Sequence, residues 1–343
     1  MAFDPVARVP LGRTGLTVTR LGFGGASIGG LFSAVRDDDA RATIRRAWAI
    51  GIRYFDTAPL YGYGTSERRI GGVLRGEPRD DFVLSTKVGR LVRAPGDVRP
   101  GDEIDRQRRG ETIDAFYVRP GTERLVFDYS ADGVRRSIDE SLGRLGLERI
   151  DIALIHDPDD HWQEALDGAY PALAKLRDEG VIRAVGAGMN QSEMLSRFVR
   201  ETDIDVVLVA GRYTLLEQGA LDELLPAAEQ RGVAVVVGGV MNSGVLANPS
   251  GTDSRFDYVP APPATVDRVR RISEVCQRHG VPLRAAAIQF PLAHPAVVSL
   301  VAGVRSVGHL DEYPSFARLE VPTGLWDELR AEGLLRDDAP TPA

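Results

Sequence analysis

Short apolar runs alternate with longer amphipathic segments along most of this chain. The apolar runs are rich in Val, Ile, Leu and Ala, which is typical of strands buried on both faces of a parallel sheet. The amphipathic segments repeat their apolar positions at helical spacing, which predicts helices packed by one face. We expect eight strands, at residues 21–24, 53–56, 82–86, 152–155, 184–188, 206–210, 234–237 and 298–302.

The segments between these strands predict helices. They lie at residues 38–50, 66–75, 131–145, 163–179, 192–202, 221–230, 264–279 and 283–292. Strand and helix alternating in this way predict a (β/α)8 barrel of the TIM type, in the α/β class. Barrels of this class often exceed the usual domain length, so we expect residues 1–343 to form one domain. A short β-hairpin is expected ahead of the first strand, with its turn at residues 12–15.

Two connections are too long for ordinary turns. Residues 88–129 follow the third predicted strand and residues 241–263 follow the seventh, whereas a βα loop usually takes about 2–6 residues. Both follow the carboxyl ends of strands, so both overhang the same mouth of the barrel. They are either disordered surface insertions, or the first shapes a substrate pocket and the second folds over a cofactor.

Composition narrows the classes of partner. The chain has 42 basic and 49 acidic residues and a net charge of −7, which argues against nucleic acid or an anionic membrane as a partner. A single cysteine, Cys276, excludes an internal disulfide. No run approaches the ~18 apolar residues of a membrane span, and the first residues do not resemble a signal peptide. We therefore expect a cytoplasmic protein.

Lysine is rare enough to be informative. Of the 42 basic residues only Lys87 and Lys175 are lysines. Lys175 lies on an amphipathic segment, where a solvated position is expected. Lys87 ends an apolar strand, where an unpaired charge would be costly. It needs a partner, and Asp56 at the end of the preceding strand is the natural one.

The candidate chemistry lies at the ends of three consecutive strands. Asp56, Lys87 and His156 end them, and Tyr61 follows Asp56 closely. The carboxyl ends of barrel strands form the active site in this fold. A nearby ammonium would lower the pKa of a tyrosine, the aspartate would hold the ammonium, and the histidine would orient a substrate oxygen. The set suits proton transfer, and a redox reaction would need a hydride carrier.

Three other interpretations are weighed against this one. The glycine-rich segment 20–27 nearly fits a dinucleotide-binding G-x-G-x-x-G pattern, but Ser27 stands where the last glycine belongs. A metal-dependent hydrolase barrel would take as ligands His156, Asp157, Asp160 and His161. A catalytically silent regulatory subunit that binds a cofactor would not need the complete set of four side chains.

Several motifs resemble those of the aldo-keto reductases. They are Asp56-Thr57-Ala58 with Tyr61-Gly62, Ser85-Thr86-Lys87-Val88-Gly89, Leu154-Ile155-His156, Gly64-x-Ser66-Glu67-x-x-x-Gly71 and Gly186-x-Gly188-x-Asn190. The resemblance covers nearly the whole chain. It implies a barrel oxidoreductase that uses NAD or NADP, with Asp56, Tyr61, Lys87 and His156 as catalytic residues and Tyr61 as general acid–base.

Three further segments resemble the aldose 1-dehydrogenase branch of that family, which includes D-threo-aldose and L-fucose dehydrogenases and lies close to pyridoxal 4-dehydrogenase. They are residues 155–161, 210–216 and 242–246. The resemblance implies oxidation of the anomeric hydroxyl of an aldose to a lactone. A pyridoxal 4-dehydrogenase or a general aldehyde and ketone reductase is the alternative within the family.

The same resemblance implies a cofactor site. Asn190 would hold the nicotinamide amide, and Tyr213 would stack on its ring. The pyrophosphate would lie along Ser243, Gly244 and Leu246. At the adenine end the corresponding residues are Gly303, Arg305 and His309, with Tyr313 where relatives that bind NADP carry an asparagine. The sequence leaves the choice between NAD and NADP open and leans towards NAD.

The long insertion after Lys87 is rich in hydrogen-bonding side chains. They are Arg90, Arg93, Asp97, Arg99, Asp102, Arg119 and Arg124. A polar wall of this kind suits a small sugar or another polar carbonyl compound better than an apolar ligand. The oligomeric state is left open by the sequence.

Overall fold

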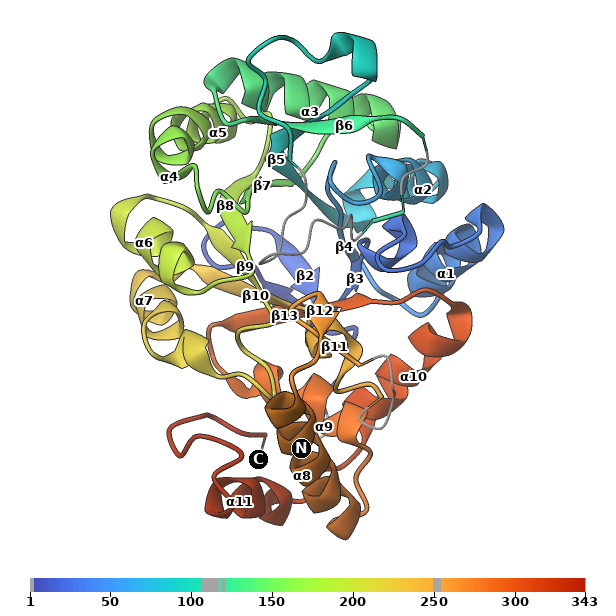
Figure 1. Cartoon of the computed structure of the whole chain (residues 1–343), viewed down its shortest axis with the longest axis vertical. Helices are drawn as coiled ribbons and strands as arrows, with labels where there is room; N and C mark the ends of the chain where they lie inside the picture. Colours follow the sequence, from blue (N-terminus) through green and yellow to red (C-terminus); the bar gives the residue numbers. More distant parts are fainter. Residues whose placement is uncertain (1–2, 106–116, 119–120, 249–253, 343) are drawn as a thin grey trace.

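Eight parallel strands form a closed barrel, which confirms the predicted fold class (Figure 1). The computed structural model describes residues 3–105, 117–118, 121–248 and 254–342. The barrel strands are β3 (Leu21–Gly24), β4 (Tyr54–Asp56), β5 (Val83–Arg93), β7 (Ile152–His156), β8 (Ala184–Met189), β9 (Val206–Ala210), β10 (Ala234–Gly238) and β13 (Val297–Gly303). Each pairs in parallel with both of its neighbours, and the pairings of β3 with β13 and β4 close the ring.

Helices surround the barrel (Figure 1). They are α1 (Asp37–Ala49), α2 (Thr65–Leu74), α3 (Ala131–Leu145), α4 (Trp162–Glu164), α5 (Tyr170–Asp178), α6 (Glu193–Glu201), α7 (Leu224–Arg231), α8 (Pro263–Arg278), α9 (Leu283–Gln289), α10 (Val307–Arg318) and α11 (Thr323–Ala331). A π-helical turn, Ala165–Ala169, joins α4 to α5, so the helix predicted over 163–179 contains one widened turn. Within the described ranges no helix is long and apolar enough to cross a membrane.

Residues that mark or interrupt helices explain which helices the sequence predicted and which it missed. The structure has α3 at its predicted bounds because both ends are marked: the Ser130 hydroxyl accepts a hydrogen bond from the Gly133 N–H, and Gly146 takes the left-handed conformation that ends a helix. The prediction omitted α10 and α11. A proline, Pro314, lies inside α10, and proline normally argues against a helix interior.

Apolar side chains fill both the inside of the barrel and the layer between barrel and helices. The predicted hairpin is present as β1 (Arg8–Pro10) and β2 (Thr17–Thr19). Its buried residues Leu11, Leu16 and Val18 belong to the core inside the barrel and close the amino-terminal end. The opposite end, where the strands finish, is therefore the open mouth.

The two long connections carry secondary structure of their own. Beyond the barrel, β5 continues to Arg93 and pairs antiparallel with β6 (Arg124–Asp128), so the third strand is longer than the predicted 82–86. After β10 a short hairpin forms from β11 (Arg255–Phe256) and β12 (Val259–Pro260). In their described parts, then, neither connection is only an irregular surface insertion. The 3-10 turns are Ser27–Gly29, Arg79–Asp81, Pro95–Asp97, Gly219–Leu221, Asn242–Gly244 and Phe290–Ala293.

Helix α2 packs closely on the end of α3 at a glycine. A Cβ on Gly71 would collide with the backbone carbonyl of Leu145, so the two helices approach at a distance that only glycine allows. The next residue, Gly72, is different: a Cβ there would lie 3.7 Å from the Arg41 guanidinium, an ordinary van der Waals contact. The two neighbouring glycines therefore form a matched pair for testing this packing.

We predict that Gly71→Ala destabilises the fold by about 1–3 kcal/mol, because the added methyl must push α2 and α3 apart. Gly72→Ala should be neutral or stabilising by about 0.5–1 kcal/mol, since it removes backbone freedom from the unfolded chain without a clash. Urea unfolding of both variants and the parent chain measures the difference. Equal stability of the two variants would contradict the close approach of the helices.

Candidate active site

A buried ion pair joins the ends of β4 and β5. The Lys87 ammonium donates hydrogen bonds to both carboxylate oxygens of Asp56, at 2.9 and 2.7 Å, and to the backbone carbonyl of Thr57 at 2.9 Å. Both side chains are almost fully buried. The pairing predicted for Lys87 is present. Because an ammonium has three donors, this set uses all of them.

Tyr61 and His156 complete the group. The Lys87 ammonium nitrogen lies 4.6 Å from the centroid of the Tyr61 ring. The His156 ring meets the Tyr61 ring edge-on, with centroids 5.8 Å apart. All four side chains predicted to be catalytic line one cavity at the barrel mouth. The fold thus brings together four residues that are separated by up to a hundred positions in the sequence.

A tight turn holds Tyr61 in place. Gly62 takes a positive φ of 65°, and its backbone lies against Gly29 so closely that a Cβ at Gly62 would collide with the Gly29 carbonyl. Only glycine combines this conformation with this approach at no steric cost. The turn carries the chain from the end of β4 to the start of α2. The side chain of Tyr61 is left partly exposed, facing the cavity.

The electrostatics of Tyr61 differ from the prediction. Burial, and then the negative charge of Asp56, raise the pKa of Tyr61 well above its ordinary value. We had expected the Lys87 ammonium to lower this pKa. The structure gives the reason: the Lys87 ammonium donates its hydrogen bonds to Asp56 and Thr57. The Asp56 carboxylate therefore largely balances the positive charge of Lys87, and little of that charge acts on the Tyr61 phenol. Because its pKa is raised in this way, the Tyr61 phenol is protonated at neutral pH.

The cavity has a volume of about 490 Å³, within the range of small-molecule sites. Six of the residues predicted to contact the cofactor line it: Asn190, Ser243, Gly244, Gly303, Arg305 and His309. Glycines at the ends of β3, β8 and β10 also face it. A Cβ on Gly244 would meet no atom within 4 Å, so this backbone borders open space. An extended cradle with exposed backbone and a basic end fits a dinucleotide.

Two predicted cofactor contacts lie elsewhere. Tyr213 does not line the cavity; it is fully buried and packs against Phe290 and His294, with ring centroids 5.2 and 5.8 Å away. Burial raises its pKa. Leu246 is also fully buried in the apolar layer outside the barrel. In this structure neither side chain therefore lies in the wall of the cavity, because each packs into the hydrophobic core behind its own loop.

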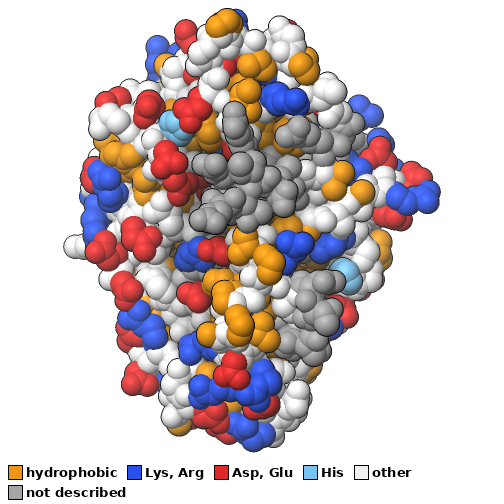
Figure 2. Space-filling view, in the orientation of Figure 1, with side chains coloured by type: hydrophobic (Ala, Val, Ile, Leu, Met, Phe, Trp, Pro, Cys, Tyr) orange, Lys and Arg blue, Asp and Glu red, His pale blue; other side chains and the backbone are white. Residues whose placement is uncertain are grey.

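The turn between β11 and β12 crosses the mouth of the barrel. Its residue Tyr258 donates a hydrogen bond from the hydroxyl to Asn190 Oδ1 at 2.9 Å, and its backbone N–H donates to Ser243 Oγ at 3.0 Å. One guanidinium nitrogen of Arg212 donates to both carboxylate oxygens of the preceding Asp257, at 2.7 and 2.8 Å. Figure 2 shows hydrophobic side chains gathered over this hairpin at the centre of the same face. The connection after β10 thus forms a strap over the cavity.

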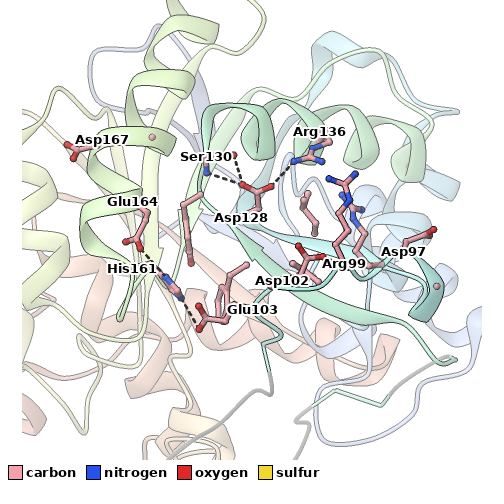
Figure 3. A pocket seen from close by; sticks show the side chains of 18 residues that line it. Asp97, Arg99, Asp102, Glu103, Asp128, Ser130, Arg136, His161, Glu164 and Asp167 are labelled. Carbon is pink, nitrogen blue, oxygen red and sulfur yellow. Dashed lines mark hydrogen bonds and ion pairs between the residues drawn. The ribbon is translucent and has the colours of Figure 1, made fainter.

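The predicted polar wall is only partly right. Arg90 lines the cavity, but Arg93, Asp97, Arg99 and Asp102 line a second groove on the outer side of the β5–β6 hairpin, which shares no lining residue with the first (Figure 3). Arg124 lines neither, and Arg119 lies outside the described residues. Successive strand residues point to opposite faces, so Arg90 and Arg93 face opposite ways.

The other interpretations lack structural support. Among the described residues no three His, Cys, Asp or Glu side chains are grouped so that they could hold a metal ion. His161, one of the ligands considered, instead packs at a tilt against the rings of Phe127 and Tyr129, with centroids 4.6 and 5.3 Å away. The glycine-rich segment 20–27 forms barrel strand β3 and the turn after it, which excludes the dinucleotide-binding βαβ unit.

Several cavity residues were not found from the sequence. Tyr117 stacks on Tyr61 with ring centroids 5.6 Å apart and an angle of 27°. Asp105 faces the same space, and Tyr258 covers it. All three lie in the long connections, where no periodic pattern indicates which side chains point inward. Both connections contain more than one aromatic residue, and nothing in the sequence marks which of them face the cavity.

Comparison with known proteins agrees with this site. Residues 20–330 match the model of the aldo/keto reductase family. The chain is 46% identical to D-threo-aldose 1-dehydrogenase from Pseudomonas sp, covering 96% of this chain and 97% of that protein. It is 42% identical to pyridoxal 4-dehydrogenase from Microbacterium luteolum, covering 95% and 97%. The fold resembles that of an aldo-keto reductase from Bacillus halodurans in its holo form, with a TM-score of 0.74 at 24% identity over 96% and 97% of the two chains. The chain therefore belongs to the aldo/keto reductase family of oxidoreductases.

Proposed function

We propose that this protein oxidises the anomeric hydroxyl of an aldose to a lactone. The observation that carries the proposal is the convergence of Tyr61, the Asp56–Lys87 pair and His156 at one point of the cavity wall. Enzymes of this family use NAD or NADP. When bound, the nicotinamide supplies the hydride acceptor for the anomeric carbon. The chain itself then has to bind the sugar, orient the hydroxyl and remove its proton.

The proton passes to Tyr61 in this proposal. The phenol faces the cavity, whereas Lys87 and Asp56 lie behind it and are almost fully buried. As the hydroxyl loses its proton and the carbon loses a hydride, the carbonyl of the lactone forms. His156 meets the Tyr61 ring from the side, so a substrate oxygen placed against the phenol would lie within reach of both rings. In the reverse direction the protonated Tyr61 donates to the carbonyl oxygen.

The substrate class is supported by the relatives and by the cavity. The two relatives above are named for an aldose and for pyridoxal, both small and polar. Charged side chains reach the cavity wall beside Tyr61 from Arg90 and Asp105. A pyridoxal 4-dehydrogenase is the alternative, since the stacked rings of Tyr61 and Tyr117 would also suit a flat aromatic substrate.

We propose NAD as the preferred cofactor. At the far end of the cavity Arg284 forms an ion pair with Glu312, so the charge of this arginine is already balanced. Arg305 is held by the Ser33 hydroxyl at 2.8 Å. A 2′-phosphate placed here would face the Glu312 carboxylate, whereas a ribose hydroxyl could donate to it.

We predict that Tyr61→Phe lowers kcat by on the order of 10²–10⁴, because the proton carrier is lost while the ring remains. Binding of NAD, followed by the change in protein fluorescence, should persist. Tyr213→Phe is the matched control: its hydroxyl is buried with no hydrogen-bond partner among the described residues, so activity should stay close to that of the parent. Near-normal turnover of Tyr61→Phe would end the proposed mechanism.

We predict that the rate depends steeply on pH for oxidation and only weakly for reduction. Since the pKa of Tyr61 is raised, only a small fraction is deprotonated at neutral pH, and kcat/KM for aldose oxidation should rise up to tenfold per pH unit. Reduction of an aldehyde uses the protonated form and should be nearly flat between about pH 6 and 8. Initial rates from pH 6 to 9 in both directions test this. An oxidation profile that levels off below about pH 8 would contradict the assignment.

We predict that Glu312→Gln shifts the preference towards NADP. Removing the carboxylate leaves the Arg284 charge unbalanced and available to a phosphate, so the ratio of kcat/KM for NAD to that for NADP should fall by about tenfold or more. Glu320→Gln, at an exposed position, is the control. Dissociation constants measured by calorimetry for both cofactors complete the test. An unchanged ratio would remove Glu312 from the explanation of NAD preference.

A further inference from the structure

A buried arginine lies in the cavity wall next to the catalytic group. Arg90 is only 7% exposed, and it follows the point where β5 leaves the barrel to pair with β6. Its Nε donates to Asp105 Oδ2 at 2.6 Å, and its guanidinium lies over the Phe127 ring, 4.8 Å from the centroid. A cation taken out of water in this way is costly unless it is fully paired.

The rest of the guanidinium holds the end of the strand that carries the catalytic histidine. Arg90 donates to the backbone carbonyls of His156 and, at 3.4 Å, of Asp157. The Tyr129 hydroxyl also donates to the His156 carbonyl, at 2.7 Å. Asp157 has a positive φ of 39°, which is strained for a residue with a side chain. Arg90 therefore helps to fix a bend immediately after His156, and with it the direction of the imidazole ring.

Its partner Asp105 faces the cavity. The backbone N–H of Asp105 donates to the Leu125 carbonyl at 2.9 Å, which anchors this residue to β6. The Asp105 carboxylate lines the same space as Tyr61 and His156. A carboxylate has about four acceptor positions, and Asp105 Oδ2 accepts the bond from Arg90 Nε. Much of the rest of the wall on this side is apolar or aromatic, contributed by Leu31, Leu60 and Tyr117.

We infer that the Arg90–Asp105 pair couples sugar recognition to the placement of His156. Asp105 binds a hydroxyl group of a polyhydroxylated substrate, and Arg90, a positioning residue, orients both Asp105 and the His156 strand end. The inference rests on the function proposed above. It explains why a charged pair is kept here, although an apolar pair of similar volume could fill the position without the cost of desolvation.

The test compares two substrates in variants at each position. Asp105→Asn should raise KM for oxidation of L-fucose about 10- to 100-fold, since a hydrogen bond to a charged acceptor is lost. KM for reduction of propanal, which has no hydroxyl group to bind, should be unchanged, and any loss of kcat through the weakened contact with Arg90 should be equal for both substrates. Arg90→Lys should lower kcat about tenfold or more for both substrates, because a compact ammonium cannot reach the three acceptors that the guanidinium meets from three separate nitrogens.

Controls come from the same strand. Arg93 pairs with Glu140 at 2.9 Å on the opposite face of β5, away from the cavity, so Arg93→Lys and Glu140→Gln should leave both substrates unaffected. Binding of NAD followed by fluorescence should be unchanged in every variant. Thermal unfolding shows whether each variant is folded, and if Arg90→Lys is not, the conservative Asp105→Asn alone decides the specificity assignment.

The outcomes separate this inference from the proposed function. If the parent chain oxidises L-fucose and Asp105→Asn changes KM for fucose and for propanal equally, the inference is wrong and the proposed function stands. If the parent chain reduces propanal but oxidises no aldose, the proposed function fails, and the assignment of Asp105 fails with it. An unchanged kcat for propanal in folded Arg90→Lys would remove the positioning role.

Discussion

The buried pair of Asp56 and Lys87 is the constraint on which the rest of the site depends. Two charges removed from water are tolerated only with close geometry and with every remaining donor and acceptor used. The barrel provides this: β4 and β5 are neighbours, the Ser85 hydroxyl donates to Asp56 at 2.7 Å, and Thr57 offers its carbonyl to Lys87. A shift of one residue between these strands would turn Lys87 to the outside. The geometry of the Asp56–Lys87 pair therefore depends directly on the register of the barrel strands.

The strand that carries Lys87 is fixed from its outer side as well. Thr86 points away from the barrel interior and donates to the buried carboxylate of Glu67 on α2 at 2.8 Å, and Glu67 in turn accepts from Arg144 on α3. Adjacent residues of a strand face opposite sides, so Thr86 must point outward when Lys87 points into the barrel. The contacts of Glu67 on the outer side of β5 and the contacts of Lys87 on its inner side thus hold the same strand in place. The tight contact of Gly71 with Leu145 belongs to the same packing of α2 against α3.

The sequence predicted the barrel and the four central residues because both follow from local patterns. Apolar runs locate strands, and a charged residue that ends such a run must lie at the barrel mouth. The sequence could not predict the direction of side chains in the long connections, where no periodicity exists. The contact of Tyr213 with a nicotinamide was inferred from resemblance alone, and in this structure the ring packs in the core beside Phe290. The pKa of Tyr61 was misjudged because it depends on how completely Asp56 and Thr57 satisfy Lys87.

The same strand, β5, carries one member of each of the two charged pairs that line the cavity. Within the barrel β5 carries Lys87, paired with Asp56; three residues later, past the bend at Gly89, it carries Arg90, paired with Asp105. Gly89 has a φ of 104°, and a Cβ there would collide with the Tyr129 ring, so the bend requires glycine. The bend brings the second pair from the inside of the barrel to the wall of its mouth. The strand register that positions the Asp56–Lys87 pair is set before Gly89, so the part of β5 beyond this glycine can place Arg90 without disturbing that pair.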